Sequence, residues 1–414
     1  FGAVPKQLSS GAASDSAVDW VRAFRAALSE ENETVMSWRQ GGIQEESHYV
    51  FQHFVRSWAS DDKGLVAGLY SGSLQQLDWT TRSVGELFEG SHRDEVICVA
   101  LNSLHVLSGS GDPGYYSRPS HDLSVKLWCR ASGRLLRSFE GHEDTVRGVV
   151  LFESDGRFGQ CCLSAGLDAK VILWSTNPNV DPFIASCALG GQCRHLRAVP
   201  SQRVGAKSLP ETEVRVLAGA FNEVVELAVR FESASDDAKP QVLILRSFTV
   251  DTSGTNREGL SGIDCFVRPE VWARLTCNAA YPESLLAEEG VTVAGGTVCG
   301  SMWVASAGRA SIVGPAVTNI FPRDVVSVEI LEGQQMVAVK RTGTLCLVSW
   351  DADFQLSQRW ARQGLRMYVS TLRRREPRLL VSDGFDNAIR TLRVGIAPGG
   401  VGSRNSVQTR SFTT

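Results

Sequence analysis

The sequence predicts an all-β repeat protein with a short helical segment before it. After His48 the chain falls into short β-rich runs, and each run ends at Gly, Asp, Asn or Ser. Such runs with turn residues between them indicate many short strands. A strand–turn–strand unit that ends in tryptophan also recurs through the first half of the chain. Hydrophobic residues form 43% of the 414 residues and charged residues 21%, so the chain can bury a large core.

Residues 15–39 form the predicted helical segment. Val18, Val21 and Phe24 recur at helical spacing, and Trp20 lies beside them. An Asp or a Ser at the start of this segment can cap the helix. Because the period changes from helical to strand-like after this segment, we expect the helix to lie outside the repeats.

The repeat is clearest in three units of the first half. They end at Trp79, Trp128 and Trp174, and each consists of a strand of small residues, a tight turn and a second strand. In the second and third units an aspartate, Asp122 or Asp168, lies six residues before the tryptophan. Units of about 40–45 residues with a Gly-His start and a Trp-Asp end mark the blades of β-propellers.

A histidine stands before each of these two units, at His92 and His142. It can form hydrogen bonds with a strand serine or with the turn aspartate, while the tryptophan packs over the edge of the blade. We therefore interpret the histidine, serine and aspartate as a structural brace of the turn and not as a catalytic triad. The stronger predicted set is His142, Ser164, Asp168 and Trp174, and the weaker set is His92, Ser108, Asp122 and Trp128.

On these residues the chain resembles WD-repeat (WD40) proteins. The resemblance is strong over residues 48–191 and continues beyond them as a strand rhythm, with a literal Trp-Asp end at Trp350–Asp351. It implies a seven-bladed β-propeller over residues 48–398, with blades at about 48–90, 91–142, 143–191, 192–250, 262–317, 318–363 and 364–398. Around it we expect a flexible segment at 1–14, a helical extension and linker at 15–47, and a C-terminal tail at 399–414. The outer strand of the last blade could come from 40–47 or from 405–412.

The N-terminal segment has a second resemblance. Trp20 and Phe24, then Ser37–Trp38 and His48, resemble the linker between the F-box and the propeller of F-box/WD-repeat proteins, with Ser37 in place of an asparagine. Membership of that family implies a substrate receptor of a cullin-type ubiquitin ligase. The F-box would lie before about residue 15, where the chain is too short for that three-helix module. The alternative is an amphipathic helix that packs on the propeller or on a neighbouring subunit.

The sequence contains no enzyme or metal signature. Gly109–Gly114 satisfies G-x-G-x-x-G, but Asp112 would repel a phosphate, Pro113 lacks an N–H donor, and a polar loop follows in place of a helix. No Walker A, G-x-S-x-G or H-E-x-x-H motif occurs, and the ten cysteines form no C-x-x-C pair. We therefore expect no catalytic residue, cofactor, metal or small-molecule substrate.

Two groups of residues are candidates for partner binding, in addition to Trp20, Phe24 and Trp38 of the linker. Tyr115 and Tyr116 lie with Arg118 on an insertion of the second blade, and exposed Tyr with Arg is a common composition of binding hot spots. The run Arg373–Arg374–Arg375 is placed between two strands of the last blade, where it could contact an acidic partner or RNA phosphate. The alternatives are a loop buried on a neighbouring blade and a solvated loop, respectively.

Charge and cysteine usage limit the function further. The net charge of −3 gives no bulk argument for nucleic acid or for an anionic membrane, and no apolar run approaches the ~18 residues of a membrane span. Scattered cysteines in apolar segments predict free thiols in a reducing intracellular compartment, either the cytoplasm or an organelle matrix such as the mitochondrial one. Phe1 is not an initiator Met, which leaves open a targeting peptide upstream.

The expected function is therefore that of a non-catalytic protein-interaction scaffold, a structural subunit of a larger multi-protein assembly. The alternative is the substrate receptor of a ubiquitin ligase. An enzyme that uses the central channel would need converging titratable residues, and the sequence shows no such cluster.

Overall fold

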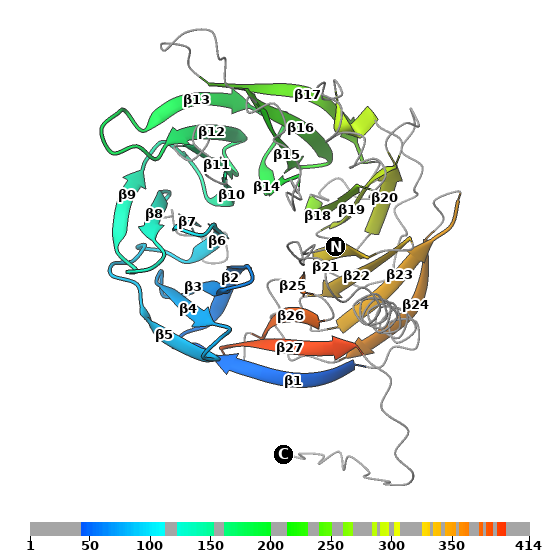
Figure 1. Cartoon of the computed structure of the whole chain (residues 1–414). Coiled ribbons are helices and arrows are strands. Elements are labelled where there is room, and N and C mark those ends of the chain that lie inside the picture. Colours follow the sequence, from blue (N-terminus) through cyan, green and yellow to red (C-terminus); the bar gives the residue numbers. More distant parts are fainter. Residues whose placement is uncertain are drawn as a thin grey trace, which may run out of the picture.

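The strands of the chain form seven sheets, which Figure 1 shows in a ring around a common centre. The expectation of an all-β propeller is confirmed, and the number of sheets equals the number of blades expected. The structure is a computed structural model, and it describes residues 43–111, 122–152, 161–199, 213–230, 240–250, 260–267, 284–287, 290–297, 302–306, 325–331, 334–340, 344–352, 356–363, 372–375, 378–383 and 387–394. No helix among these residues is long and apolar enough to cross a membrane.

Neighbouring strands within each sheet are antiparallel, and most sheets are built from consecutive strands. The first sheet contains β2 (Val55–Ser60), β3 (Gly64–Leu69), β4 (Leu74–Asp78) and β5 (Ser83–Leu87). The second contains β6 (Val96–Leu101), β7 (His105–Ser110), β8 (Val125–Cys129) and β9 (Leu135–Phe139). The third contains β10 (Val146–Leu151), β11 (Cys161–Gly166), β12 (Lys170–Ser175) and β13 (Phe183–Ala188).

The remaining sheets follow the same order around the ring. The fourth contains β14 (Cys193–Ala198), β15 (Glu213–Ala220), β16 (Glu223–Arg230) and β17 (Gln241–Thr249). The fifth contains, among the described residues, β18 (Leu260–Val267), β19 (Val291–Thr297) and β20 (Met302–Ser306), with the short 3-10 helix η2 (Leu285–Ala287) between β18 and β19. The sixth contains β21 (Val325–Leu331), β22 (Gln335–Lys340), β23 (Thr344–Trp350) and β24 (Leu356–Gln363).

The seventh sheet closes the ring with strands from both parts of the chain. It contains β25 (Leu372–Arg375), β26 (Arg378–Asp383), β27 (Ala388–Val394) and, as its outer strand, β1 (Ile43–Val50). β1 pairs with β27 from Ile43 opposite Val394 to Val50 opposite Ala388. Of the two segments considered for closure, 40–47 and 405–412, the N-terminal one therefore supplies the outer strand. Its main-chain hydrogen bonds join the start of the ring to its end.

This closure corrects two boundaries drawn from the sequence. The propeller begins at Ile43 and not at residue 48, so the end of the expected linker at 15–47 is a strand. The first blade in turn begins at Val55, because His48 pairs with Arg390 in the closing sheet. The strand pattern at this position was visible in the sequence, but its partner lies more than 300 residues away along the chain.

The run Arg373–Arg374–Arg375 is a strand and not a connection between strands. It forms most of β25, where Arg373 is opposite Leu380 and Arg375 is opposite Arg378. The physical reason is the short connection at residues 376–377, which lets the basic run pair with the apolar strand that follows it. Other predictions lie outside the described residues, namely those for Trp20, Phe24 and Trp38 of the helical extension, Tyr115, Tyr116 and Arg118 of the insertion, segment 1–14 and tail 399–414.

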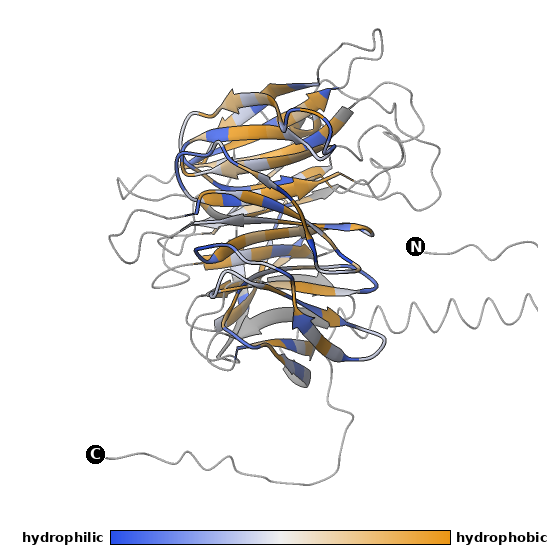
Figure 2. Ribbon diagram, turned by 90° about the vertical axis from the view of Figure 1, so that its left-hand side faces the viewer, coloured by the Kyte–Doolittle hydropathy of each residue, from blue (hydrophilic) through white to orange (hydrophobic). Residues whose placement is uncertain are grey.

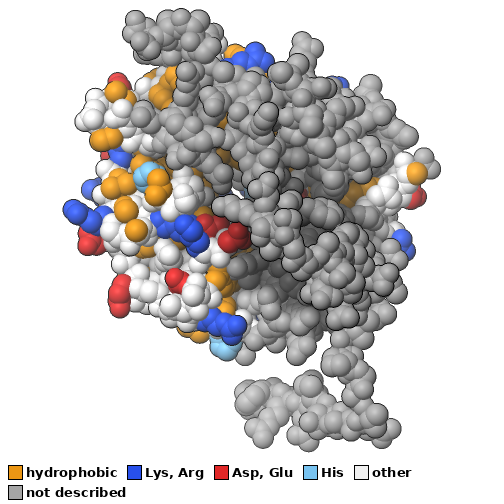
Figure 3. Space-filling model, viewed as in Figure 1, with side chains coloured by type: hydrophobic (Ala, Val, Ile, Leu, Met, Phe, Trp, Pro, Cys, Tyr) orange, Lys and Arg blue, Asp and Glu red, His pale blue; other side chains and the backbone are white. Residues whose placement is uncertain are grey.

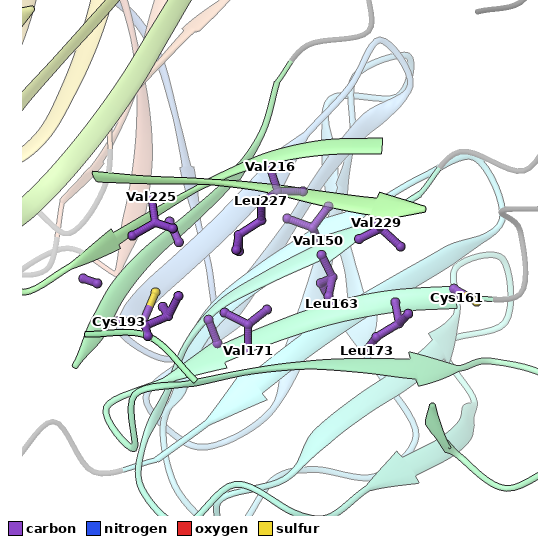
Figure 4. Packing of buried hydrophobic residues seen from close by; sticks show 14 of the residues in the cluster. Val150, Cys161, Leu163, Val171, Leu173, Cys193, Val216, Val225, Leu227 and Val229 are labelled. Atoms are coloured by element: carbon purple, nitrogen blue, oxygen red, sulfur yellow. The ribbon is translucent and has the colours of Figure 1, made fainter. Parts of the chain in front are cut away.

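The cores lie between adjacent sheets. Figure 4 shows aliphatic side chains of the third and fourth sheets, such as Leu163 and Leu227, packed against each other, and both are fully buried. Figure 2 shows hydrophobic residues concentrated along the strands. Gly109 allows a close approach of the second and third sheets, since a Cβ there would lie 2.6 Å from the Val146 side chain. The sheets therefore form one rigid frame on which turns and loops are held.

Candidate functional site

The third sheet contains a chain of four hydrogen-bonded side chains. His142 contacts Asp168 Oδ2 through Nδ1 at 2.8 Å and Ser164 Oγ through Nε2 at 2.7 Å. Trp174 Nε1 donates to the same Ser164 Oγ at 2.7 Å. The carboxylate of Asp168 also accepts the backbone N–H of Lys170 at 3.1 Å, which fixes the turn between β11 and β12. The structure thus brings the stronger predicted set together from two strands, the turn between them and the loop before β10.

The second sheet repeats this arrangement with the weaker predicted set. His92 contacts Asp122 Oδ2 at 3.2 Å and Ser108 Oγ at 2.8 Å, and Trp128 Nε1 donates to Ser108 Oγ at 2.8 Å. Burial lowers the pKa of His92, so the ring is neutral and Nδ1–H donates to the carboxylate. Burial alone would raise the pKa of Asp122, but hydrogen bonds from His92 and Ser124 outweigh it and hold that pKa below its usual value.

These geometries suit a brace and leave no room for nucleophilic catalysis. Ser108 and Ser164 are fully buried, and each hydroxyl already contacts a tryptophan N–H and a histidine ring nitrogen. A serine nucleophile must reach an external substrate, which neither of these hydroxyls can do. The serine, histidine and aspartate therefore act as internal partners that satisfy one another.

The first sheet lacks this chain of four and is held differently. Trp79 lies just after β4, and its Nε1 donates to the Asp61 carbonyl at 3.0 Å. The Asp61 carboxylate pairs with Arg130 of the second sheet, with Nη2 at 2.8 Å from Oδ1. Burial alone would raise the pKa of Asp61, but Arg130 and two backbone N–H groups hold it below its usual value. A bidentate ion pair thus clamps the first two sheets together.

One face of the ring is formed by the turns between the second and third strands of the sheets. In four sheets the first residue of this turn donates its N–H to the carbonyl just before the inner strand. The pairs are Tyr70 to Phe54, Gly111 to Glu95, Leu167 to Thr145 and Phe221 to Gln192. These bonds place the turns and the starts of the inner strands on the same face, which we call the turn face.

Exposed aromatic rings lie on the turn face. Tyr70 is 45% exposed and Phe221 is 39% exposed, in equivalent turns of the first and fourth sheets. Phe221 has a φ of 51°, in the left-handed region that favours glycine and asparagine. The chain therefore holds a bulky, partly exposed ring in an unfavourable backbone conformation. The connection that carries Tyr115, Tyr116 and Arg118 starts at Gly111 and ends at Asp122, so both of its ends belong to the turn face.

Three arginines that the sequence reasoning missed start the inner strands at this face. Arg56, Arg147 and Arg194 each follow the first residue of β2, β10 or β14, at a register shift in the pairing with the next strand. The residue before each is fully buried and each arginine is only half-buried, as expected if the bulge turns it away from the sheet. Arg56 pairs with Glu95 at 2.8 Å, and Arg194 Nε is buried without a hydrogen-bond partner among the described residues. The sequence signal that could have predicted these arginines is a Val or Cys followed directly by Arg, which recurs at the start of three of the repeat units.

A cluster of titratable residues spans the inner strands β14, β18 and β21. Arg197 Nη2 lies 2.8 Å from Asp264 Oδ1, and its Nη1 lies 3.4 Å from Glu329 Oε1. Burial raises the pKa of Asp264 to about 6, and the charge of Glu329 adds to the rise while Arg197 opposes it. The sequence analysis found no converging titratable residues, because these three lie up to 132 positions apart and meet only in the folded ring. The cluster ties three neighbouring sheets together.

The described residues offer no cluster of three or more His, Cys, Asp or Glu side chains that could hold a metal ion. The eight cysteines that the structure describes are free thiols: Cys98, Cys129, Cys161, Cys162, Cys187, Cys193, Cys265 and Cys346. Burial raises the pKa of several of them to about 12, as at Cys193, so these thiols stay protonated and unreactive.

Comparison with solved structures decides the fold. The structure of U3-55K is similar over 85% of this chain and 98% of that one, with a TM-score of 0.54 and 13% identity. The crystal structure of the RRP9 WD40 repeats is similar over 85% and 97%, with a TM-score of 0.55 and 14% identity. The chain has the WD40 β-propeller fold.

Sequence comparison adds one local likeness. A guanine nucleotide-binding protein subunit beta from Arabidopsis thaliana is 35% identical over 80 residues, which is 19% of this chain and 19% of that protein. The match therefore spans about a fifth of the length of the curated relative. No family model matches the chain.

Proposed function

We propose that the protein is a non-catalytic WD40 scaffold, a structural subunit that holds other proteins in a multi-subunit assembly. The observation that carries this proposal is Phe221, a partly exposed aromatic ring in the left-handed region on a rigid turn. Strained residues persist where function requires them, and exposed aromatics on fixed frames serve as binding anchors. Tyr70 supplies a second exposed ring on the same face.

Several further observations support a role in binding and not in catalysis. Both histidine–serine–aspartate groups are internal braces, whose polar atoms bond to one another within the sheets. The fold is shared with the U3-55K and RRP9 WD40 repeats, and rigid propellers present many loops at once. Other proteins are the proposed partners, with no cofactor, small-molecule substrate, nucleic acid or membrane insertion. The proposed location is a reducing intracellular compartment, cytoplasm or organelle matrix, with the mitochondrial matrix among the options.

The test separates binding from folding through the strain at Phe221. Tagged full-length protein is purified from its native cells as wild type, as Phe221→Asn and as Leu104→Ser, and stoichiometric companions are quantified by mass spectrometry. Asn fits the left-handed turn, so Phe221→Asn should fold at least as stably as wild type and lose a companion. Leu104, 57% exposed in the turn between β6 and β7, is the matched control and should lose none. Full retention of companions by Phe221→Asn would overturn the role of this face.

A second candidate function is the substrate receptor of a cullin-type ubiquitin ligase. The observation that favours it is the set of arginines at the starts of inner strands, Arg56, Arg147 and Arg194, which suits recognition of an acidic segment. Co-purification of a cullin adaptor, together with loss of a substrate in the Arg147→Gln/Arg194→Gln double variant, would favour this candidate. A fixed set of assembly subunits without a cullin adaptor would favour the scaffold.

A further inference from the structure

A patch of exposed apolar side chains lies on the rim of the ring, away from the turn face. Four of the nine large hydrophobic side chains that are exposed among the described residues belong to it, and they come from β9, from β13 and from the connection before β13. The four are Leu135 (41% exposed), Leu136 (50%), Val180 (49%) and Phe183 (49%). We call them the rim patch. Figure 3 shows hydrophobic side chains exposed on the side of the molecule where the second and third sheets lie.

Hydrogen bonds from Arg137 join the two halves of the rim patch. Its guanidinium donates to the carbonyls of Ser175, Asn177 and Val180, and the bond to Val180 measures 2.7 Å. It also lies 5.7 Å from the centre of the Phe139 ring. The connection before β13 is thereby held against β9 at Arg137, which directly follows Leu136 in the chain.

Phe183 is a fixed ring and not a loose surface side chain. It packs edge-on against Trp174 with ring centroids 6.2 Å apart, and Trp174 packs against Phe139 at 5.5 Å. Trp174 is itself held by its hydrogen bond to Ser164. A rigid aromatic ring binds with a small loss of conformational entropy, which is the property of a hot spot.

The edges of these strands lack the usual protection against contact. β13 has the sequence FIASCA and contains no charged residue, and β9 contains only Arg137, whose donors are used internally. Outer strands normally carry charges that discourage association. The outer strand β1, by contrast, has the sequence IQEESHYV with two glutamates. Among the outer strands that the structure describes, β13 is therefore the one without a charged side chain.

The charges at the border of the patch indicate what kind of partner fits. Asp181 caps the Phe183 N–H at 2.9 Å, is exposed, and pairs with no basic side chain among the described residues. At the other end Arg134 already pairs with Glu89 at 3.5 Å. A second copy of this chain would bring the same four side chains, and the basic side chain described at this border, Arg134, is already paired. A different protein with an apolar segment and a neighbouring Lys or Arg would satisfy both the hydrophobic rings and Asp181.

We propose that the rim patch binds another subunit of the assembly through an apolar segment flanked by a basic residue. This interface rests on the proposed scaffold function but shares no residue with the turn face. The two surfaces are tested by different variants, so one proposal can fail without the other. The assembly would then hold this chain at two surfaces, one on a face of the ring and one on its rim.

The test uses full-length protein in its native assembly with three variants. Leu136→Glu places a charge in the patch, and Asp181→Asn removes the border charge while its side-chain oxygen still accepts the Phe183 N–H. Val50→Glu is the control, since Val50 is 55% exposed on the outer strand β1. Thermal unfolding checks that all three fold. We expect Leu136→Glu to lose one companion at least tenfold, Asp181→Asn to weaken the same companion, and Val50→Glu to retain it.

Amide hydrogen exchange of the purified assembly adds a readout that a general loss of fold would not give. Residues 135–139 and 180–188 should be protected in the assembly relative to the isolated protein. Retention of every companion by Leu136→Glu, or no protection of these strands, would overturn the proposal. A homodimer of the pure protein that Leu136→Glu dissociates would also overturn it, because the occupant would then be a second copy.

Discussion

Single residues in this propeller differ in their local geometry: some brace the fold, and others are the ones that we propose for binding. Ser164 accepts a hydrogen bond from Trp174 and contacts His142, and all three side chains are buried. Phe221 is partly exposed and adopts a backbone conformation that costs an L-residue roughly 1–2 kcal/mol. The first pattern stabilises the ring, and the second is retained at a cost in stability.

Removal of the shared hydroxyl tests the bracing role. Ser164→Ala leaves the Trp174 N–H and a nitrogen of His142 buried without their partner, so the free energy of unfolding should fall by about 1–3 kcal/mol. Chemical denaturation measures this change, with Ser186→Ala on the exposed face of β13 as a control. An unchanged free energy of unfolding for Ser164→Ala would contradict the assignment of these four side chains as a brace.

Relief of the strained turn tests the cost at Phe221. Replacement by Asn, which tolerates the left-handed region, should raise the free energy of unfolding by about 1 kcal/mol. The same denaturation experiment measures it. A clear loss of stability would show that the ring of Phe221 contributes to packing and would weaken its assignment as a binding anchor.

At the scale of elements, inner strands join neighbouring sheets through buried charges. Asp264 of β18 contacts Arg197 of β14 and accepts the backbone N–H of Ile330 in β21 at 2.6 Å. A second buried carboxylate, that of Glu226 in β16, holds η2 in place by accepting the backbone N–H groups of Leu285 and Leu286. Such buried carboxylates fix the relative position of sheets at the expense of desolvation.

The raised pKa of Asp264 predicts how this connection depends on pH. Burial raises the pKa to about 6 from an unfolded value near 3.8, so the folded state binds more protons between these two values. The free energy of unfolding should therefore fall as pH rises from about 4 to about 6, and the stabilisation is lost above that range. Asp264→Asn, which cannot titrate, should reduce this slope.

Denaturation of wild type and Asp264→Asn at several pH values measures the difference. Asp78→Asn is a suitable control, because the pKa of Asp78, at the end of β4, is lowered by hydrogen bonds from the backbone N–H groups of Thr81 and Thr80 and so acts with the opposite sign. Equal slopes for wild type and Asp264→Asn between pH 4 and 6 would contradict the pH prediction for the inner strands.

The sequence predicted elements well where their pattern is local. The braces around His92 and His142 combine residues within about 40 positions of one another, and their spacing is regular in two units. The prediction that the first repeat unit ends in a strand tryptophan was wrong in detail, because Trp79 lies one residue beyond β4. Its ring N–H donates to the Asp61 carbonyl and not to a serine. Contacts between distant strands left no local pattern, so the cluster around Asp264 was not predicted. The bulged arginines did leave a local signal, a Val or Cys followed by Arg, but the sequence alone does not show that this pair marks the start of an inner strand.

At the scale of the whole molecule, closure of the ring makes the sheets interdependent. β1 supplies the outer strand of the last sheet, so the first described strand and the last one hold each other. The sequence left this choice open between two segments, because strand propensity does not specify a partner over such a distance.

Deletion of the closing strand tests this interdependence. A chain without residues 43–50 leaves the edge of β27 open, so we expect it to lose its cooperative unfolding transition and to aggregate through that edge. Differential scanning calorimetry and sedimentation measure these effects, with a chain that lacks only residues 1–14 as the control. A cooperative, monomeric chain without β1 would contradict the role of this strand.

The central claim is that a braced, closed propeller binds partner proteins through its turn face. The most direct measurement is amide hydrogen exchange of the full-length protein in its native assembly and alone. We predict slower exchange in the assembly at residues 70–73 and 221–223, with no change at residues 102–105 in the turn between β6 and β7. Unchanged exchange at the first two turns in a stable assembly would contradict the claim.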